Sequence, residues 1–400
     1  MSADKQAIVV GAGLAGAAAA RALADQGWQV LVLDMAAEPC HGGSGVPVGV
    51  LSCHVSIDDN PLSQLSRAGV LMTRQFAQSH LREGEHWMGT GVLERRMSPN
   101  ASPKKAWAAP AADSVWHGHV DLATPTQLQQ AGLPVDDTQA LWQHQGAWIK
   151  PRALVKALLT HNAIQFLGLS EVESMQRQAH TSTWQLRVKT HIPIPSMGSS
   201  HTFSSESASH VVLALGGQTP DFLNQVLYVE DMGLHPIAGQ VSWGWMSDLP
   251  AGDLPPFAVN GHGSFVSNVP TIDGSAWFTG ATFERNAQHV PNPAQAHSDN
   301  LKRLSELLPQ ASEPLLNAYA NMGDLQAWTG VRCATVNRLP KLGPLDAQHF
   351  PGLYLLTGMG SRGLSLAMIC ANALVADIEG TPSPVSDLLR KAMRCQITAP

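Results

Sequence analysis

The first forty residues alternate between short apolar runs and one stretch of small residues. Residues 7–10, AIVV, form an uninterrupted apolar run of the kind found in a strand buried on both faces. Residues 15–27 read as a helix with small residues on one side, and residues 28–34, WQVLVLD, form a second apolar run. This order predicts one strand–helix–strand unit over Gln6–Asp34.

The turn between the first strand and the helix carries three glycines with dinucleotide-binding spacing. Gly11 allows a tight turn, Gly13 lets the backbone approach a pyrophosphate, and Gly16 lets helix and strand pack closely. Asp34 ends the second strand, where an acid can accept hydrogen bonds from ribose. The remaining positions of this candidate site are Ala12, Leu14, Ala15 and Met35. The motif predicts a dinucleotide cofactor and does not by itself separate NAD from FAD.

A second loop rich in glycine and serine follows at residues 39–53. An FAD molecule is longer than one strand–helix–strand unit, so it needs further backbone contacts. Gly43, Ser44, Gly45 and Gly49 can supply amides with little steric bulk. Taken alone the loop reads as an ordinary surface loop; together with the first motif it favours FAD.

The pattern further along predicts mixed structure. Helices are expected over 58–82, 152–159 and 300–319, and two or three short strands over 161–189. Residues 191–210 are rich in Ser and Pro and predict a hairpin tip or loop. Residues 211–217 predict a buried strand that returns to the first sheet, and the short alternating segments over 235–283 predict an antiparallel sheet.

These elements predict an α/β protein with a discontinuous cofactor-binding domain and a substrate domain inserted into it. The cofactor-binding domain is expected over residues 1–90, 146–235 and 325–400. The substrate or cap domain is expected over residues 91–145 and 236–324.

The composition of the chain limits its expected partners, metal sites and cellular location. Hydrophobic residues make up 44% and charged residues 14% of the 400-residue chain, and the net charge of −6 offers no global attraction to nucleic acid. Five scattered cysteines without a CxxC pair suggest neither zinc nor a disulfide framework, and no other metal site is expected. No signal peptide or membrane span is apparent, so a cytoplasmic location is expected. Arg95, Arg96, Lys104 and Lys105 could contact phosphates, although such loop charges are more often simply solvated.

Motifs spread along the chain resemble the D-amino-acid-oxidase-like superfamily of FAD-dependent oxidoreductases. The closest likeness is to the oxidoreductase domain of bifunctional enzymes that modify the wobble uridine of tRNA. The matching segments are GAGLAG at 11–16, GSGVPVG at 43–49, GAWIKPRALVKALL at 146–159, VVLALGG at 211–217, AGQVSW at 238–243, TGATFERN at 279–286, GVRCATVNRLPKLG at 330–343 and GMGSRGL at 358–364.

The resemblance implies a Rossmann-like FAD-binding domain with an inserted antiparallel-sheet domain, as in glycine oxidases, and FAD held non-covalently. It assigns Arg332 to the substrate carboxylate, as the catalytic and substrate-binding arginine, because a guanidinium fork fits a carboxylate. It also assigns Phe265 and Phe283 to substrate binding. Further FAD contacts are implied at Val172, Ala214, Gly216, Gly358, Gly360, Ser361, Arg362, Gly363 and Leu364.

The implied reaction is oxidation of a C–N bond in a secondary amine that carries a carboxylate. For tRNA, carboxymethylaminomethyl-uridine would give aminomethyl-uridine and glyoxylate, and a separate methyltransferase would act next. Two alternatives stay open: an oxidase or dehydrogenase of free glycine, sarcosine or D-amino acids, and a flavin-binding protein without catalysis. The chain departs from the family pattern at Val46, where a polar residue is usual, and at Lys341, where an apolar one is common.

Overall fold

The structure, a computed structural model, describes residues 5–96, 114–137, 140–194, 198–229, 232–249, 254–290, 292–310, 313–320 and 325–395. The chain divides into two compact units. Unit 1 comprises Met1–Gly45, Pro151–Ile237 and Val331–Pro400, and unit 2 comprises Val46–Lys150 and Ala238–Gly330. Residues 46–90 thus belong to unit 2, whereas the sequence grouped them with the cofactor-binding part; the roles assigned to the two parts stay predictions.

Unit 1 is built on a sheet of six strands in the order β20-β21-β13-β1-β2-β9, counted over the described residues. The strands are β1 (Gln6–Val10), β2 (Gln29–Leu33), β9 (Ile164–Leu167), β13 (His210–Leu213), β20 (Lys341–Pro344) and β21 (Leu353–Thr357). All neighbours pair in parallel except β20, which runs antiparallel to β21. The predicted strand–helix–strand unit is confirmed, with α1 (Leu14–Asp25) between β1 and β2.

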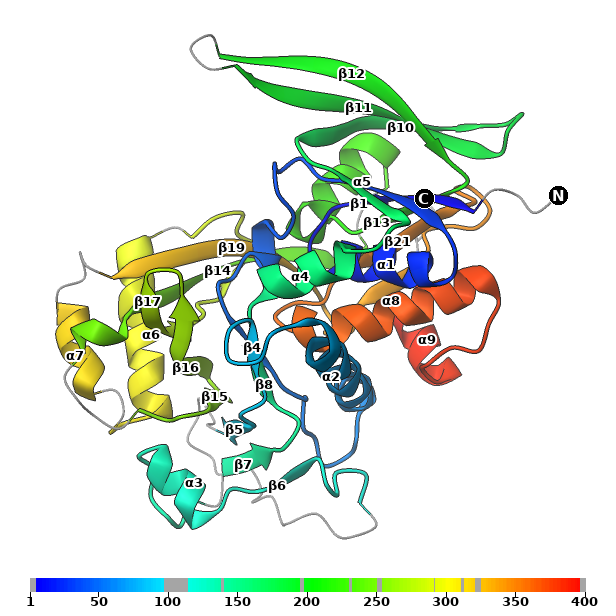
Figure 1. The fold of residues 1–400 in the computed structure, drawn as a ribbon. Coiled ribbons are helices and arrows are strands. Elements are labelled where there is room, and N and C mark those ends of the chain that lie inside the picture. The colour runs from blue at the N-terminus through cyan, green and yellow to red at the C-terminus, as the bar shows by residue number, and fades with distance from the viewer. Residues whose placement is uncertain are drawn as a thin grey trace. The chain divides into compact units, whose positions relative to one another are not determined.

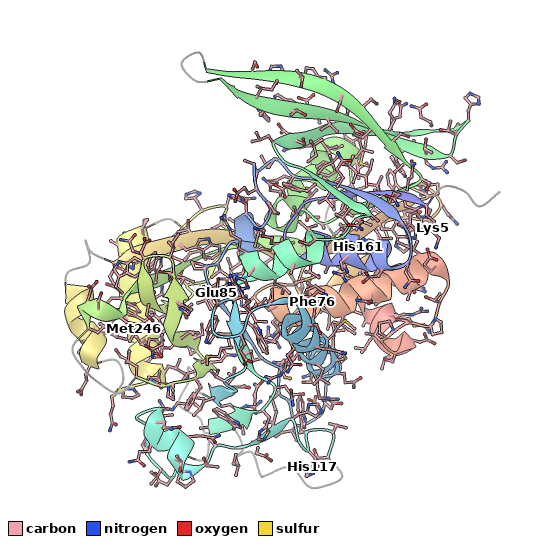
Figure 2. The ribbon with its side chains drawn as sticks, in the orientation of Figure 1. Lys5, Phe76, Glu85, His117, His161 and Met246 are labelled. Carbon is pink, nitrogen blue, oxygen red and sulfur yellow. The ribbon has the colours of Figure 1, made fainter. Side chains whose placement is uncertain are left out.

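Helices cover one face of this sheet. The helix α1 packs against α4 (Pro151–Leu159) and α8 (Gly363–Glu379), as Figure 1 shows, and α9 (Asp387–Met393) follows α8. Small side chains on α1, including Ala17 and Ala19, are fully buried, which allows the close approach of α8. At the far end of α8, Glu379 accepts hydrogen bonds from Lys5 Nζ at 2.7 Å and Trp28 Nε1 at 2.6 Å; Lys5 is labelled in Figure 2.

The other face of the sheet packs against α5 (Thr219–Leu227) and a second, three-stranded sheet. Its strands are β10 (Ser170–Gln178), β11 (Thr183–Ile194) and β12 (Gly198–Ala208), all antiparallel. Alternate residues of β11, namely Trp184, Leu186 and Val188, are buried in the shared core. The predicted hairpin tip or loop over 191–210 is therefore wrong for residues 191–194, which end β11, and for residues 198–208, which form β12 and pair with β11.

Unit 2 contains a sheet of nine strands among the described residues, in the order β18-β14-β17-β16-β15-β5-β7-β6, with β19 also paired to β14. The strands are β5 (Val92–Arg95), β6 (Val120–Leu122), β7 (Ala140–Gln143), β14 (Leu234–Trp245), β15 (Ala258–Gly261), β16 (Gly263–Thr271), β17 (Gly274–Gly280), β18 (Glu284–Arg285) and β19 (Gln326–Thr335). A smaller antiparallel sheet joins β3 (Gly49–Leu51), β8 (Ala147–Ile149) and β4 (Trp87–Met88). The expected antiparallel sheet over 235–283 is confirmed.

The helices of unit 2 are α2 (Pro61–His80), α3 (Pro125–Gln130), α6 (Pro293–Leu307) and α7 (Glu313–Ala320), within the part of the chain that is described. Asn60 caps α2 by accepting a hydrogen bond from the backbone amide of Ser63 at 3.1 Å. The expected single helix over 300–319 is wrong, because α6 starts earlier and ends at Leu307. Pro309 follows that end, and a proline cannot donate the amide that would continue a helix.

Candidate nucleotide-binding site at the carboxyl edge of the parallel sheet

The predicted cofactor residues of unit 1 gather at one edge of its sheet. Since β1, β2, β13 and β21 are parallel, their carboxyl ends meet at the same edge. Gly11 follows β1, Asp34 follows β2, Ala214 follows β13 and Gly358 follows β21. In open sheets of this kind, ligands bind in the crevice outside the carboxyl ends of the strands.

The first turn requires glycine for steric reasons. Gly11 has φ +105°, and a Cβ there would lie 2.5 Å from Ala214 O. A Cβ on Gly16 would lie 1.8 Å from Gly11 O, so this turn admits no side chain at either position. Gly13 caps α1, and the amide of Leu14 in the first turn donates to Ser44 Oγ at 3.1 Å.

Asp34 ties two loops together. One carboxylate oxygen accepts from the amide of Ala12 at 2.6 Å and the other from the amide of Ala36 at 2.8 Å. These bonds hold the loop after β2 against the turn after β1, and each carboxylate oxygen retains a second acceptor position. Met35 is 49% exposed, and its sulfur lies 3.1 Å from Gln218 Nε2.

Two glycine pairs approach one valine from different loops. The first member of each pair, Gly42 and Gly216, has φ near +60° and borders open space where a Cβ would be. The second members, Gly43 and Gly217, lie close to Val331. A Cβ on Gly43 would lie 2.7 Å from the carbonyl oxygen of Val331, and a Cβ on Gly217 would lie 2.8 Å from its Cγ1. Gly42, Gly217 and Val331 were not among the predicted site residues, although the doubled glycines are a signal that the sequence carries.

Arg332 is thereby held at the same edge as these loops. It follows Val331 on β19, and the carbonyl of the next residue, Cys333, accepts from the amide of Gly360 at 2.8 Å. The side chain of Arg332 is half-buried, and its Nη1 atom is buried. The turn after β2, the turn after β13 and the loop after β21 thus all touch the backbone around Arg332.

The loop after β21 places a second helix N-terminus beside the first. Gly358 and Gly360 have φ of +77° and +56°, and α8 begins at Gly363 after Arg362 as its N-cap. A Cβ on Gly363 would lie 3.0 Å from Leu14 Cδ1, so the starts of α8 and α1 adjoin. Helix N-termini favour anions through their amides and dipole. Ser361 is exposed, and Leu364 is buried.

Of the remaining predicted residues, Gly45 belongs to the first glycine loop and the others lie elsewhere. The side chain of Val172 on β10 is buried in the core of unit 1. Gly45 ends the short 3₁₀ turn Gly42–Ser44, whereas Gly49 begins β3 in unit 2. In unit 2, Phe265 is 0% exposed within a hydrophobic cluster that includes Trp277, whereas Phe283 is 44% exposed.

Two cysteines near these loops are not thiolates at neutral pH. Burial raises the pKa of Cys40 to about 12, and its sulfur donates to Ser44 O at 3.1 Å. Burial likewise raises the pKa of Cys333. Both therefore act as small buried groups that pack the site rather than as nucleophiles.

The edge fits a dinucleotide. Left-handed glycines at 42, 216 and 360 border open space, and two helix N-termini adjoin.

Among the described residues, no group of three or more His, Cys, Asp or Glu side chains could hold a metal ion. No helix within those residues has the length and apolar character needed to cross a membrane. At the two departures from the family pattern, Lys341 Nζ donates to Arg394 O at 3.4 Å, and Val46 packs against a hydrophobic cluster of unit 2.

Comparison with known proteins adds a family match. The model of a family described as FAD dependent oxidoreductase matches residues 6–377. The chain is 41% identical over 396 residues to the tRNA 5-methylaminomethyl-2-thiouridine biosynthesis bifunctional protein MnmC of Paracidovorax citrulli, covering 96% of this chain and 59% of that protein. It is 39% identical over 417 residues to the protein of the same name from Verminephrobacter eiseniae, covering 97% and 63%. The chain thus spans about three fifths of the length of these curated relatives.

Solved structures share the fold at low sequence identity. Glycine oxidase from Geobacillus kaustophilus superposes with a TM-score of 0.70 at 17% identity, covering 99% of this chain and 100% of that one. Iminodiacetate oxidase from Chelativorans sp. BNC1 gives a TM-score of 0.66 at 18% identity, covering 97% and 99%. The expected mixed α/β fold of the glycine-oxidase type is confirmed.

Proposed function

This chain belongs to the family of FAD-dependent oxidoreductases, and we propose that it oxidises a C–N bond of a secondary amine that carries a carboxylate. The observation that carries the proposal is the convergence on β19: Gly43, Gly217 and Gly360 all touch the backbone next to Arg332. A cationic fork held among the loops expected to hold a flavin suits an anionic substrate.

The residues of the carboxyl edge would hold FAD without a covalent bond. The amides at the start of α1 would meet the pyrophosphate and Asp34 the ribose, while the loops at Gly42–Ser44, Gly216 and Gly358–Gly363 would meet the flavin end. Bound FAD supplies the two-electron acceptor, and the protein contributes orientation and electrostatics.

Arg332 would bind the carboxylate of the substrate through two parallel hydrogen bonds. This fixes the carbon between the carboxylate and the amine. Removal of a hydride from that carbon and a proton from the nitrogen leaves a C=N bond, and addition of water then cleaves it into an aldehyde and a primary amine. For a carboxymethylamino group the aldehyde is glyoxylate.

We propose the wobble uridine of tRNA as the carrier of that group, and this rests on the relatives. Two of them, 39–41% identical to this chain, are named for the biosynthesis of a methylaminomethyl-thiouridine in tRNA. The substrate is then carboxymethylaminomethyl-uridine and the products are aminomethyl-uridine and glyoxylate. A methyltransferase is the partner that this product requires.

A free amine of the glycine or sarcosine type is the second candidate. The net charge of −6 favours it, because the chain as a whole does not attract a polyanion.

Anaerobic reduction of the bound flavin separates the candidates. Tracking flavin bleaching, we expect tRNA from cells arrested at the carboxymethylaminomethyl stage to reduce the protein and to release glyoxylate. Reduction by glycine or sarcosine alone would favour the second candidate, and no reduction by either would leave a flavin-binding protein without catalysis. In cells lacking the gene, mass analysis of tRNA should show carboxymethylaminomethyl-uridine accumulating.

A further inference from the structure

An exposed aromatic ring lies beside one arginine at an edge of the large sheet in unit 2, and a second arginine follows two residues later in the chain. Phe283 follows β17 and is 44% exposed, and Arg285 ends the edge strand β18 and is also exposed. Arg303 comes from α6, which packs along β16 and β17 (Figure 1). Its guanidinium carbon lies over the ring of Phe283, 5.7 Å from the centroid.

The position of Arg303 is fixed from behind. Its Nη1 donates to the carbonyl of Ala281 at 2.8 Å, two residues before Phe283. This bond restrains the guanidinium beside the aromatic ring, which lowers the entropy lost when a ligand binds. The remaining N–H groups of the fork keep their capacity to donate.

These two arginines form no ion pair within the part of the chain that is described. Other arginines of unit 2 form ion pairs, as Arg67 does with Asp59 at 2.7 Å and Arg95 with Asp137 at 3.0 Å. Within the described residues, Arg285 and Arg303 have no carboxylate oxygen within 4.0 Å. Both guanidinium groups are therefore outside any ion pair among those residues, although Glu284 adjoins Arg285 in the sequence.

We propose that Phe283, Arg285 and Arg303, here called the Phe283 cluster, bind single-stranded RNA of the tRNA that carries the substrate uridine. Arginine forks match phosphate oxygens, and an exposed ring stacks on a base. Proteins contact RNA bases mostly in unpaired loops, where the bases are accessible. A single exposed ring with two arginines therefore suits a single-stranded loop better than a duplex. A free amino acid has no phosphate for these cations to meet. The inference rests on the proposed function and adds to it the surface that binds the RNA.

Binding of a fluorescently labelled anticodon stem–loop RNA, measured by anisotropy over a salt series, tests the cluster. Arg285→Gln and Arg303→Gln should each weaken binding at low salt and reduce the slope of log K against log salt by about 0.7–0.9. Phe283→Leu should weaken binding by roughly fivefold to 100-fold and leave that slope unchanged. Arg285→Lys keeps the charge and should keep the slope.

Arg82→Gln is the matched control, because its side chain is 72% exposed in the same unit and pairs with Glu85. It should bind RNA like the unaltered protein. Flavin absorbance and thermal unfolding check that each variant folds. Equal RNA binding by the unaltered protein and by Arg285→Gln, Arg303→Gln and Phe283→Leu would overturn the inference and leave the proposed function standing. RNA binding through the cluster without flavin reduction by modified tRNA would overturn the proposed reaction instead, and no RNA binding at low salt would overturn both.

Discussion

At the scale of single residues, the position of Arg332 is set by its neighbours. Val331 before it meets Gly43 and Gly217, and Cys333 after it meets the amide of Gly360. The sequence could single out Arg332 by its motif and the glycines by theirs. It could not show that they meet, because about 290 residues separate Gly43 from Val331 and only the sheet brings them together.

Replacing Arg332 should affect substrate binding more than flavin binding. We expect Arg332→Ala to raise KM and to lower kcat/KM, because the carboxylate loses its charged partner. The loss corresponds to roughly 2–5 kcal/mol of transition-state stabilisation. Arg332→Lys keeps the charge but loses the planar fork, so an intermediate loss is expected. Steady-state kinetics and flavin absorbance measure the two effects separately. The control Arg152→Ala removes an exposed arginine of unit 1 that pairs with Glu38; kinetics of Arg332→Ala equal to this control would refute the carboxylate role.

A methyl group at residue 43 should loosen the site. The Cβ of Gly43→Ala would lie 2.7 Å from Val331 O, so backbone must move on one side or the other. Overpacking of this kind typically costs about 1–3 kcal/mol, and FAD affinity should fall with it. Denaturant unfolding and FAD titration check both. In Gly363→Ala the nearest atom is the end of the Leu14 side chain, 3.0 Å away, which can turn aside; a larger loss there than at residue 43 contradicts the argument.

At the scale of elements, continuous apolar runs made two strands predictable, and the lack of an apolar face hid another. The apolar runs of β1 and β2 are buried, and the sequence predicts both strands. In β12, by contrast, residues 201–205 are all exposed, so the strand shows no apolar face. The strand forms because its backbone pairs with β11, and this pairing cannot be recognised from the pattern of apolar and polar side chains in β12. The division between α6 and α7 was missed although Pro309 is visible in the sequence.

A buried polar layer joins α6 to β14 and should make stability depend on pH. His297 on α6 is 7% exposed, and its Nδ1 lies 2.8 Å from Ser242 Oγ. Asn300 Nδ2 donates to Gln240 O at 2.9 Å in the same layer. Burial lowers the pKa of His297 below its usual value of 6.5, so the folded protein holds this ring neutral.

The sign follows from linkage. Stability from a neutral His297 is fully present above pH 6.5 and is lost as the pH falls below that, since the unfolded chain takes up the proton more readily. His297→Gln should flatten the decline of the unfolding free energy between about pH 6.5 and 5. Burial also lowers the pKa of His119 and His210, so part of the decline should remain. Denaturant unfolding over this range measures the slopes, and identical slopes in both proteins would show that His297 is not responsible.

At the scale of the whole molecule, the sequence predicts that the cofactor-binding domain is discontinuous, but it predicts the boundaries of that domain less well. The motifs are local, so each can be found in one short window. The division after Gly45 depends on what the next forty residues pack against. The amphipathic pattern of α2 indicates that Leu65 and Val70 are buried, as they are, but a pattern cannot name the surface that buries them.

Because the sheet of unit 1 is completed only by its last segment, unit 1 should not fold in a chain that is cut before that segment. Residues 1–325 lack β21, which pairs with β13, and α8, which covers α1. The loss exposes the buried alanines of α1 and removes the loop that contains Gly358 and Gly360. We expect this fragment to take up no FAD and to show a smaller cooperative unfolding transition by circular dichroism than the whole chain, because nearly all of unit 2 is retained but unit 1 is not. A short Gly-Ser insertion after Thr181, in the exposed turn between β10 and β11, should leave both properties intact. A fragment that still unfolds cooperatively and binds FAD would mean that residues 1–325 contain a complete core and that β21 and α8 are additions to it.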